Sequence, residues 1–276
     1  MTCIEYNNFK LYNENCIDVM QYMYDNSIGV DVTICSPPYD NLRNYNSTTE
    51  WNFETFKKVA QGLWNVTNDG GVIVWVVGDA CINGSETGSS FKQALYFMEL
   101  GFKLHDTMIF EKNSSTFPAR RDSKRYTQIF EYMFIFVKGK IHDCKLIADK
   151  PNKYAGFTSW SEQVIYDKDG NKVRTSKTKP VPEFSLRNNI WKYTVGFNTK
   201  KFGNHPAVFP LQLAIDHILS WSLPEHVIFD PFLGSGTTMD ACIKTDRSNF
   251  IGCEIDKEYF EIIKNKVEYY GNGNSL

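Results

Sequence analysis

No stretch of the 276-residue chain approaches the roughly 18 uninterrupted apolar residues that a membrane-spanning helix needs. Residues 1–12 also lack the basic segment followed by an apolar segment that marks a secretory signal. These absences argue against a helical membrane protein and favour a cytoplasmic location. With 42% hydrophobic and 22% charged residues, the chain has the composition of a globular protein rather than a disordered one.

The sequence also lacks a cysteine pattern that would hold a metal ion. Its seven cysteines include no CxxC pair, and none has a histidine partner at ligand spacing. Cys35, Cys242 and Cys253 instead fall within apparent strands and helices. We therefore expect reduced, mostly buried thiols, with neither a metal site nor a disulfide framework.

Net charge is small, −2 at pH 7, which taken alone argues against a nucleic-acid-binding protein. The charge is unevenly distributed, however, because residues 112–204 contain 19 Lys and Arg against 8 Asp and Glu. The remainder of the chain is acidic, so we expect one basic face of the kind that binds a phosphate backbone. The alternative interpretation is a set of solvated lysines on a loop-rich insert.

Apolar segments alternate with amphipathic ones along most of the chain. Residues 30–35 and 72–77 are apolar almost throughout, as expected for strands covered on both faces, and 68–71 is a predicted turn. The pattern predicts further strands at 9–12, 104–112, 129–138, 227–229 and 249–253, and helices at 17–24, 53–66, 91–100, 211–221, 239–245 and 258–269. This alternation is typical of an α/β sheet with helices on both faces.

Between residues 139 and 203 the periodic pattern dissolves, and basic and aromatic residues occupy apparent loops. We interpret this span as an insert between residues 1–138 and 204–276. Trp160 and Trp191 could stack on bases, but aromatic residues of a small module more often form its core, and we favour that interpretation.

A stiff turn follows the first buried strand, where residues 33–39 are TICSPPY. Two adjacent prolines fix their own φ angles and push the preceding residue out of the helical region. Ser36, Pro37, Pro38 and Tyr39 should therefore hold a hydroxyl, a carbonyl and a ring in fixed relation. A simple loop cap is the alternative, and this stretch alone does not decide between them.

A second turn, DPFLGSGTT at residues 230–238, lies between a predicted strand and a predicted helix. Gly234 and Gly236 allow the backbone to approach a ligand closely, and a helix N-terminus offers N–H groups to an anion. Glu254 ends the next strand, where an acid can bind both hydroxyls of a ribose. Met239 replaces the third glycine of a dinucleotide fingerprint, which favours a cofactor with one nucleoside and no pyrophosphate, such as S-adenosylmethionine, whose amino group Asp230 could meet.

Four motifs together, SPPY at 36–39, HPAVFP at 205–210, DPFLGSGTT at 230–238 and IGCEID at 251–256, resemble those of the amino-methylating DNA methyltransferases. The resemblance is to the group in which the catalytic motif precedes the cofactor motif. It implies a Rossmann-like S-adenosylmethionine-dependent sheet with an inserted basic target-recognition region. The parts would be a catalytic half at 1–138, the target-recognition insert at 139–203 and a cofactor-binding half at 204–276.

The resemblance also assigns roles to residues. Ser36 to Tyr39 would be catalytic, Glu254 would bind the ribose, Ile255 would pack on adenine, and His205 to Phe209 would close over the methionine end of the cofactor. Asn15 is a departure, because the family often has aspartate there to help bind adenine. The predicted cofactor contacts are Asn15, Cys16, His205, Phe209, Asp230, Phe232, Gly234, Ser235, Gly236, Thr237, Glu254 and Ile255.

Methyl transfer to an exocyclic amine requires hydrogen-bond acceptors of this kind whatever the family. The exocyclic amine of cytosine or adenine is a poor nucleophile, and acceptors such as the Ser36 hydroxyl and the Pro37 carbonyl would favour a tetrahedral nitrogen. The base must be flipped out of the duplex, where Tyr39 could stack on it. Serine in place of aspartate favours N4 of cytosine over N6 of adenine.

Double-stranded DNA is the expected partner, and Arg120, Arg121, Lys124 and Arg125 are candidate phosphate contacts, with a solvated loop as the alternative. The resemblance also allows a homodimer and a cognate restriction endonuclease. An enzyme acting on RNA or a small amine, and a DNA-binding module that has lost catalysis, are the alternative functions.

Overall fold

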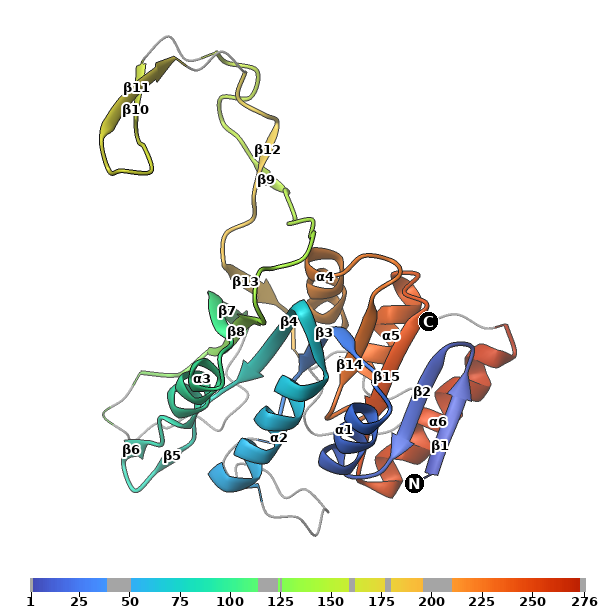
Figure 1. Cartoon of the computed structure of the whole chain (residues 1–276). Helices are drawn as coiled ribbons and strands as arrows, with labels where there is room; N and C mark the ends of the chain where they lie inside the picture. The colour runs from blue at the N-terminus through green and yellow to red at the C-terminus, as the bar shows by residue number, and fades with distance from the viewer. Residues whose placement is uncertain are drawn as a thin grey trace. The chain divides into compact units, whose positions relative to one another are not determined.

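The computed structural model describes residues 2–38, 51–113, 124, 126–158, 162–176, 180–195 and 210–273 (Figure 1). The chain divides into two compact units. The main unit comprises Met1–Lys145 and Asn189–Leu276, and the insert unit comprises Leu146–Asn188. Tyr39, Arg120, Arg121, Arg125, Trp160, His205 and Phe209 lie outside the described residues.

A mixed sheet forms the centre of the main unit, and nine strands of the described residues belong to it. Seven of them run in the same direction, namely β2, β15, β14, β3, β4, β7 and β13, while β1 and β8 are antiparallel to their neighbours. In spatial order the strands are β1 (Thr2–Tyr6), β2 (Phe9–Asn13), β15 (Asn249–Cys253), β14 (Val227–Asp230), β3 (Val30–Cys35), β4 (Thr67–Val77), β8 (Phe130–Val137), β7 (Lys103–Lys112) and β13 (Ile190–Tyr193).

Helices cover both faces of this sheet, as the sequence predicts (Figure 1). One face carries α1 (Cys16–Asp25), α2 (Phe53–Val66) and α3 (Ser89–Glu99). The other face carries α4 (Leu211–Trp221), α5 (Thr237–Lys244) and α6 (Lys257–Gly271). The predicted α/β fold is therefore confirmed.

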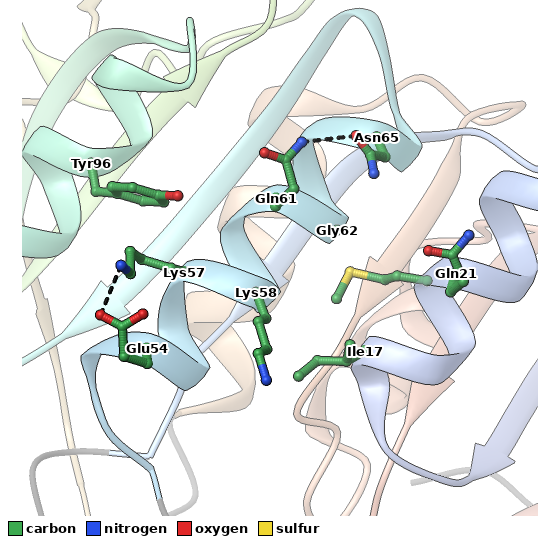
Figure 2. A pocket seen from close by; sticks show the side chains of 10 residues that line it. Ile17, Gln21, Glu54, Lys57, Lys58, Gln61, Gly62, Asn65 and Tyr96 are labelled. Carbon is green, nitrogen blue, oxygen red and sulfur yellow. Dashed lines mark hydrogen bonds and ion pairs between the residues drawn. The ribbon is translucent and has the colours of Figure 1, made fainter.

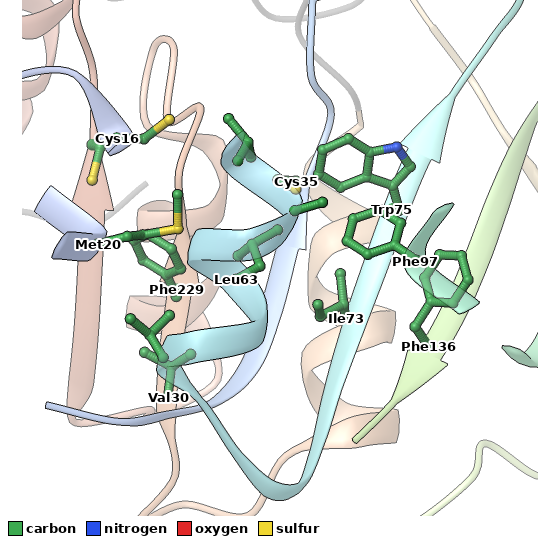
Figure 3. Packing of buried hydrophobic residues seen from close by; sticks show 14 of the residues in the cluster. Cys16, Met20, Val30, Cys35, Leu63, Ile73, Trp75, Phe97, Phe136 and Phe229 are labelled. Carbon is green, nitrogen blue, oxygen red and sulfur yellow. The ribbon is translucent and has the colours of Figure 1, made fainter. Parts of the chain in front are cut away.

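Aromatic, aliphatic and sulfur-containing side chains fill the space between the sheet and the first three helices (Figure 3). Trp75 of β4 is fully buried, with its ring centroid 5.1 Å from that of Phe97 and 5.8 Å from that of Phe56. Its indole N–H donates to Gln93 Oε1 at 2.8 Å, so burial leaves no polar group unpaired there. Fully burying a large apolar side chain stabilises a fold by about 1.5–3 kcal/mol, and this cluster fixes β4 against α2 and α3.

Several predicted elements coincide with the observed ones, including the strands at 30–35 and 249–253 and the helices at 53–66 and 211–221. The predicted turn at 68–71 is wrong, because these residues belong to strand β4. The reason lies in long-range pairing: the Gly70 N–H donates to the Lys138 carbonyl at 2.7 Å, and Thr67 pairs with Val30. Tertiary hydrogen bonds thus override the local turn preference of an Asn-Asp-Gly-Gly stretch.

Two strands of the main sheet, β1 and β13, were not predicted. β13 pairs in parallel with the end of β7, so residues 190–193 extend the sheet rather than a loop. Trp191 and Tyr193 are both buried, and the Trp191 ring lies 4.6 Å from the His217 ring of α4. Trp191 is therefore a core residue, but of the main unit and not of a separate module.

The described residues of the insert unit include four short strands. β9 (Lys150–Pro151) pairs with β12 (Phe184–Ser185), and β10 (Glu162–Tyr166) forms an antiparallel hairpin with β11 (Lys172–Ser176). Asp167 stabilises the hairpin turn, because its Oδ1 accepts from the N–H groups of Asp169 and Asn171 at 2.9 and 2.8 Å. A further small hairpin in the main unit joins β5 (Cys81–Ile82) to β6 (Ser85–Glu86).

Within these described ranges, no helix has the length and apolarity that crossing a membrane would require.

Candidate functional site

The strand order reverses between β14 and β3, which are adjacent and parallel. From β14 the chain passes through α5 to β15 on one side, and from β3 it passes through α2 to β4 on the other side. In open α/β sheets, ligands bind at the carboxyl ends of the strands beside such a reversal. We call the edge at which β2, β15, β14, β3 and β4 end the carboxyl edge, and it is the candidate site.

The glycine turn between β14 and α5 lies at this edge. Gly234 and Gly236 have φ angles of +55° and +88°, in the left-handed region that glycine adopts without strain. Gly236 is the N-cap of α5, and no side chain forms a capping hydrogen bond there. The first turn of α5 therefore offers backbone N–H groups, through Thr237 onward, to an anionic ligand.

Close packing holds the turn against β15. The Leu233 N–H donates to the Cys253 carbonyl at 2.8 Å, and Leu233 also packs over Gly252. A Cβ atom on Gly252 would lie 2.6 Å from Leu233 Cδ2, so any larger residue would displace the Leu233 side chain. The turn is thus fixed to the neighbouring strand before any ligand arrives.

Glu254 follows β15 and is 8% exposed. Its two carboxylate oxygens accept from the backbone N–H groups of Gly234 and Asp256, each at 2.7 Å. Burial raises the pKa of Glu254 to about 7, and the nearby carboxylates of Asp256 and Asp230 add to the rise. Each oxygen retains acceptor capacity, so this carboxylate can bind two hydroxyl groups of a ligand.

Asp230 ends β14 and is 1% exposed. Its carboxylate accepts from the Phe232 N–H at 2.9 Å and from the Thr238 hydroxyl at 2.5 Å. Burial raises the pKa of Asp230 to about 7, although these two hydrogen bonds favour the charged form. Asp230 therefore ties both sides of the glycine turn together, in addition to any contact with a ligand.

Asn15 and Cys16 lie at the start of α1, beside Glu254. The Asn15 side chain is the N-cap of this helix and accepts from the Ile17 N–H at 3.0 Å. Cys16 is buried, and burial raises the pKa of its thiol to about 12, with the Glu254 charge as a smaller cause. The Asn15 side chain thus caps α1, a role that asparagine and aspartate fill about equally well.

The catalytic turn of the prediction follows β3, next to β14. Cys35 pairs with Trp75 of β4, so Ser36 leaves the sheet between the ends of β14 and β4. Ser36 is partly exposed and Pro37 is buried. The structure thus brings the described part of the SPPY motif to the same edge as the glycine turn and Glu254, although 194 residues separate Ser36 from Asp230 in the sequence.

Phe232 and Ile255 provide the apolar part of this edge. The Phe232 ring lies 5.4 Å from Trp51, which precedes α2, and 6.2 Å from Trp75. Ile255 is 40% exposed beside Glu254, as a residue that packs on a ligand ring would be. Ser235, in the glycine turn between Gly234 and Gly236, is partly buried.

Two residues that the sequence analysis did not single out also contribute to this edge. The Asn13 side chain donates to the Glu254 carbonyl at 2.8 Å, and Trp51 contacts Phe232 edge to face. Asn13 could have been found from its position at the end of β2, had the adjacency of β2 and β15 been known. Trp51 gives no such signal, because it follows a polar segment without periodicity.

A shallow hollow of about 350 Å³ lies elsewhere, between α1 and α2 (Figure 2). Met20 and Gly62 line it, together with Lys58 and Gln61. This hollow is separate from the candidate site. None of the described residues predicted to bind cofactor or substrate lines it, although Ile17 follows Cys16 in sequence. Among the described residues, no group of three or more His, Cys, Asp or Glu side chains is placed to hold a metal ion.

Comparisons with known proteins agree with this architecture. The orphan methyltransferase M.BamHII of Bacillus amyloliquefaciens is 50% identical over 245 residues, which cover 87% of this chain and 89% of that protein. Among solved structures, the cytosine-N4-specific PvuII DNA methyltransferase aligns with a TM-score of 0.66 at 17% identity, covering 98% of this chain and 95% of that one. The M1.HpyAVI–SAM complex aligns with a TM-score of 0.59 at 24% identity, covering 94% and 99%.

These two structures establish the likeness of the fold. The family evidence is independent of them, because residues 30–265 match a model described as DNA methylase. This match spans β3, the glycine turn and Glu254, and M.BamHII is half identical over most of both chains. The chain therefore belongs to the DNA methylase family.

Proposed function

We propose that the protein is a site-specific DNA methyltransferase that transfers a methyl group from S-adenosylmethionine to N4 of a flipped cytosine. One observation carries the proposal: the glycine turn with Glu254 and the turn that begins at Ser36 lie side by side where the strand order reverses. A nucleoside-binding site and a rigid hydroxyl-bearing turn thus share one edge of the sheet.

The residues of the carboxyl edge fit S-adenosylmethionine. Glu254 presents a buried carboxylate, fixed by two backbone N–H groups, to the hydroxyls of a ribose. Exposed Ile255 would pack on the adenine, and the uncapped N-terminus of α5 would bind the carboxylate of the methionine part. The cofactor supplies a methyl group already activated on a sulfonium.

Ser36 and Pro37 would prepare the amine. The Ser36 hydroxyl and the Pro37 carbonyl accept the two N–H bonds of the target amine, which directs the nitrogen lone pair out of the ring plane. Since Pro37 and Pro38 fix the backbone, the acceptors are held before the base arrives. No strong base is needed before attack, and the proton can leave afterwards.

Cytosine is favoured over adenine by Ser36, because serine at this position is typical of N4-cytosine enzymes. The PvuII methyltransferase, a structural neighbour, is named as cytosine-N4-specific. The N6-adenine alternative uses the same acceptors and the same cofactor pocket.

Target recognition is the proposed role of the span 139–203. The connection leaves β8 at the edge opposite the carboxyl edge and returns along β13, which ends beside Lys112 of β7. In the insert unit, the hairpin of β10 and β11 has exposed Tyr166 and Lys172 at paired positions. A two-stranded ribbon of this kind fits the major groove, where base edges can be read.

The test is incubation with labelled S-adenosylmethionine and duplex DNA, followed by digestion to nucleosides. We expect N4-methylcytosine. N6-methyladenine would overturn the base assignment while leaving the enzyme class intact. Salt-dependent DNA binding without any methylated nucleoside would support an inert DNA-binding module, and preference for RNA in a competition assay would support an RNA methyltransferase.

A further inference from the structure

A row of aromatic rings runs from the buried core to the surface at the carboxyl edge. The Phe97 and Phe136 rings are fully buried with centroids 4.8 Å apart, and Phe134 follows at 6.1 Å from Phe136. Tyr132 stacks on Phe134 at 5.3 Å with an interplanar angle of 11°. Phe91 ends the row, 5.4 Å from Tyr132 in an edge-to-face arrangement.

The outer end of this row lies near the proposed catalytic turn. β8 is antiparallel to β4, so the start of β8 lies beside the end of β4, where Tyr132 pairs with Val77. β4 in turn pairs with β3, where Trp75 is opposite Cys35. Tyr132 is therefore only two strands away from the strand that leads into Ser36.

The helix turn that carries Phe91 is anchored to the end of β4. It lies in the first turn of α3, whose N-terminus is fixed by the buried carboxylate of Asp79 at the end of β4. Asp79 accepts from the Ser90 N–H at 2.9 Å and from the hydroxyls of Ser89 and Ser90 at 3.1 and 2.5 Å. The end of β4 therefore sets the position of the Phe91 ring relative to the carboxyl edge.

Half of the Phe91 side chain is exposed, so part of its ring is open to solvent. Tyr126 is fully exposed and Ile129 is 40% exposed on the chain that enters β8, where Lys124 is also exposed. This combination of open aromatic faces and a positive charge is typical of surfaces that bind unstacked nucleotides. DNA must reach this edge if the amine is to meet Ser36.

We propose that Phe91 and Tyr132 form a stacking platform for a base of the DNA strand adjacent to the flipped cytosine. The inference rests on the proposed function, since it places DNA at the carboxyl edge. Flipping one base unstacks its neighbours, and an aromatic ring at the surface would compensate for the lost stacking. Phe91 would then act in DNA binding and not in cofactor binding.

The experiment measures the Kd for a fluorescein-labelled duplex by anisotropy, with S-adenosylhomocysteine present. The duplex carries the site that wild-type protein methylates, or a mixed genomic fragment if no site has been mapped. We expect Phe91→Ala to raise the Kd by about tenfold or more, and Phe91→Trp and Tyr132→Phe to retain wild-type affinity because each keeps a ring. The Kd for S-adenosylmethionine should be unchanged in all three variants.

Leu95→Ala is the matched control, because Leu95 is exposed on α3 one turn further from the carboxyl edge. Its DNA affinity should equal that of the wild type. Wild-type affinity in Phe91→Ala, or an equal loss in Leu95→Ala, would overturn the platform. This readout is separate from turnover, so a wild-type protein that binds DNA but methylates adenine, or nothing, would contradict the proposed function and not the platform.

Discussion

The Gly234 N–H donates a hydrogen bond of 2.7 Å to the Glu254 carboxylate, joining the glycine turn to the end of β15. The two halves of the proposed nucleoside site are thus held together by a direct contact. A ligand that binds Glu254 therefore binds a carboxylate whose direction is already set by the turn that would hold the rest of the cofactor.

Replacement of Glu254 by Gln should weaken cofactor binding. The amide has one acceptor oxygen, so it cannot serve both the Gly234 and Asp256 N–H groups and two ribose hydroxyls. We expect the Kd for S-adenosylmethionine, measured by calorimetry, to rise at least about tenfold, since hydrogen bonds to charged groups contribute about 1.5–3 kcal/mol. Glu258→Gln, at an exposed position of α6, should bind as the wild type does. If both variants bind S-adenosylmethionine with the same Kd, Glu254 does not contact the cofactor.

The stability of the ligand-free protein should depend on pH through Glu254. Burial raises the pKa of Glu254 from its ordinary 4.5 to about 7, so between these values the folded protein binds more protons than the unfolded chain. Stability then falls as pH rises through this window, and the loss is complete above the folded pKa. Wild-type protein should lose about 1–3 kcal/mol relative to Glu254→Gln between pH 5 and 8.

Urea unfolding at pH 5, 6, 7 and 8 would measure this difference. The comparison with Glu254→Gln cancels the titration of groups that do not interact with Glu254. The Asp230 carboxyl, whose pKa is also raised to about 7 by burial, interacts with Glu254 and therefore contributes to the measured difference. Parallel curves for the two proteins would show that Glu254 is charged at all of these pH values.

Removal of the Ser36 hydroxyl should abolish most turnover while cofactor binding is retained. In Ser36→Ala the proposed acceptor for the amine is lost, and removing one such group typically lowers kcat by about 10²–10³. Single-turnover methylation of duplex DNA would measure the loss. Ser85→Ala, in the exposed hairpin of β5 and β6, is the control and should turn over normally. Unchanged turnover in Ser36→Ala would show that another group accepts the amine protons.

Truncation of Phe97 should destabilise the main unit strongly. This ring is fully buried between Trp75, Phe56 and Phe136, so Phe97→Ala leaves a cavity that costs about 3–5 kcal/mol. Met98→Ala, at the exposed neighbouring position, should change the free energy of unfolding by less than about 0.5 kcal/mol. A similar small effect for Phe97→Ala, measured by urea unfolding, would contradict the packing of α3 on the sheet.

Sequence reasoning located those elements whose burial depends on local pattern. Residues 30–35 are apolar because β3 is covered on both faces, and α2 carries its apolar stripe at helical spacing. It missed β13, since four residues give little pattern and the partner strand β7 lies about 80 residues earlier. Residues 68–71 were predicted wrongly because their place in β4 depends on pairing with Lys138, far away in sequence.

The same distinction applies to the site. Some features of the site can be recognised from residue type alone: glycines where φ is positive, a proline pair, and an acid at a strand end. Gly234, Gly236 and Glu254 were predicted on this basis, and the structure places them at one edge of the sheet. Asn13 and Trp51 contact residues that are distant in sequence, Glu254 and Phe232, so no local sequence pattern predicts their position at the site. The capping role of Asn15 likewise required the structure.

The insert unit joins the main unit through Lys145 and Asn189, and neither junction belongs to a segment that forms the glycine turn, the Glu254 strand end or the Ser36 turn. If this unit selects the DNA sequence, the segment that selects the target can evolve independently of the segments that carry out methyl transfer. Related enzymes could then acquire new recognition sequences by exchanging one stretch of about 40 residues, with the catalytic apparatus passed on unaltered.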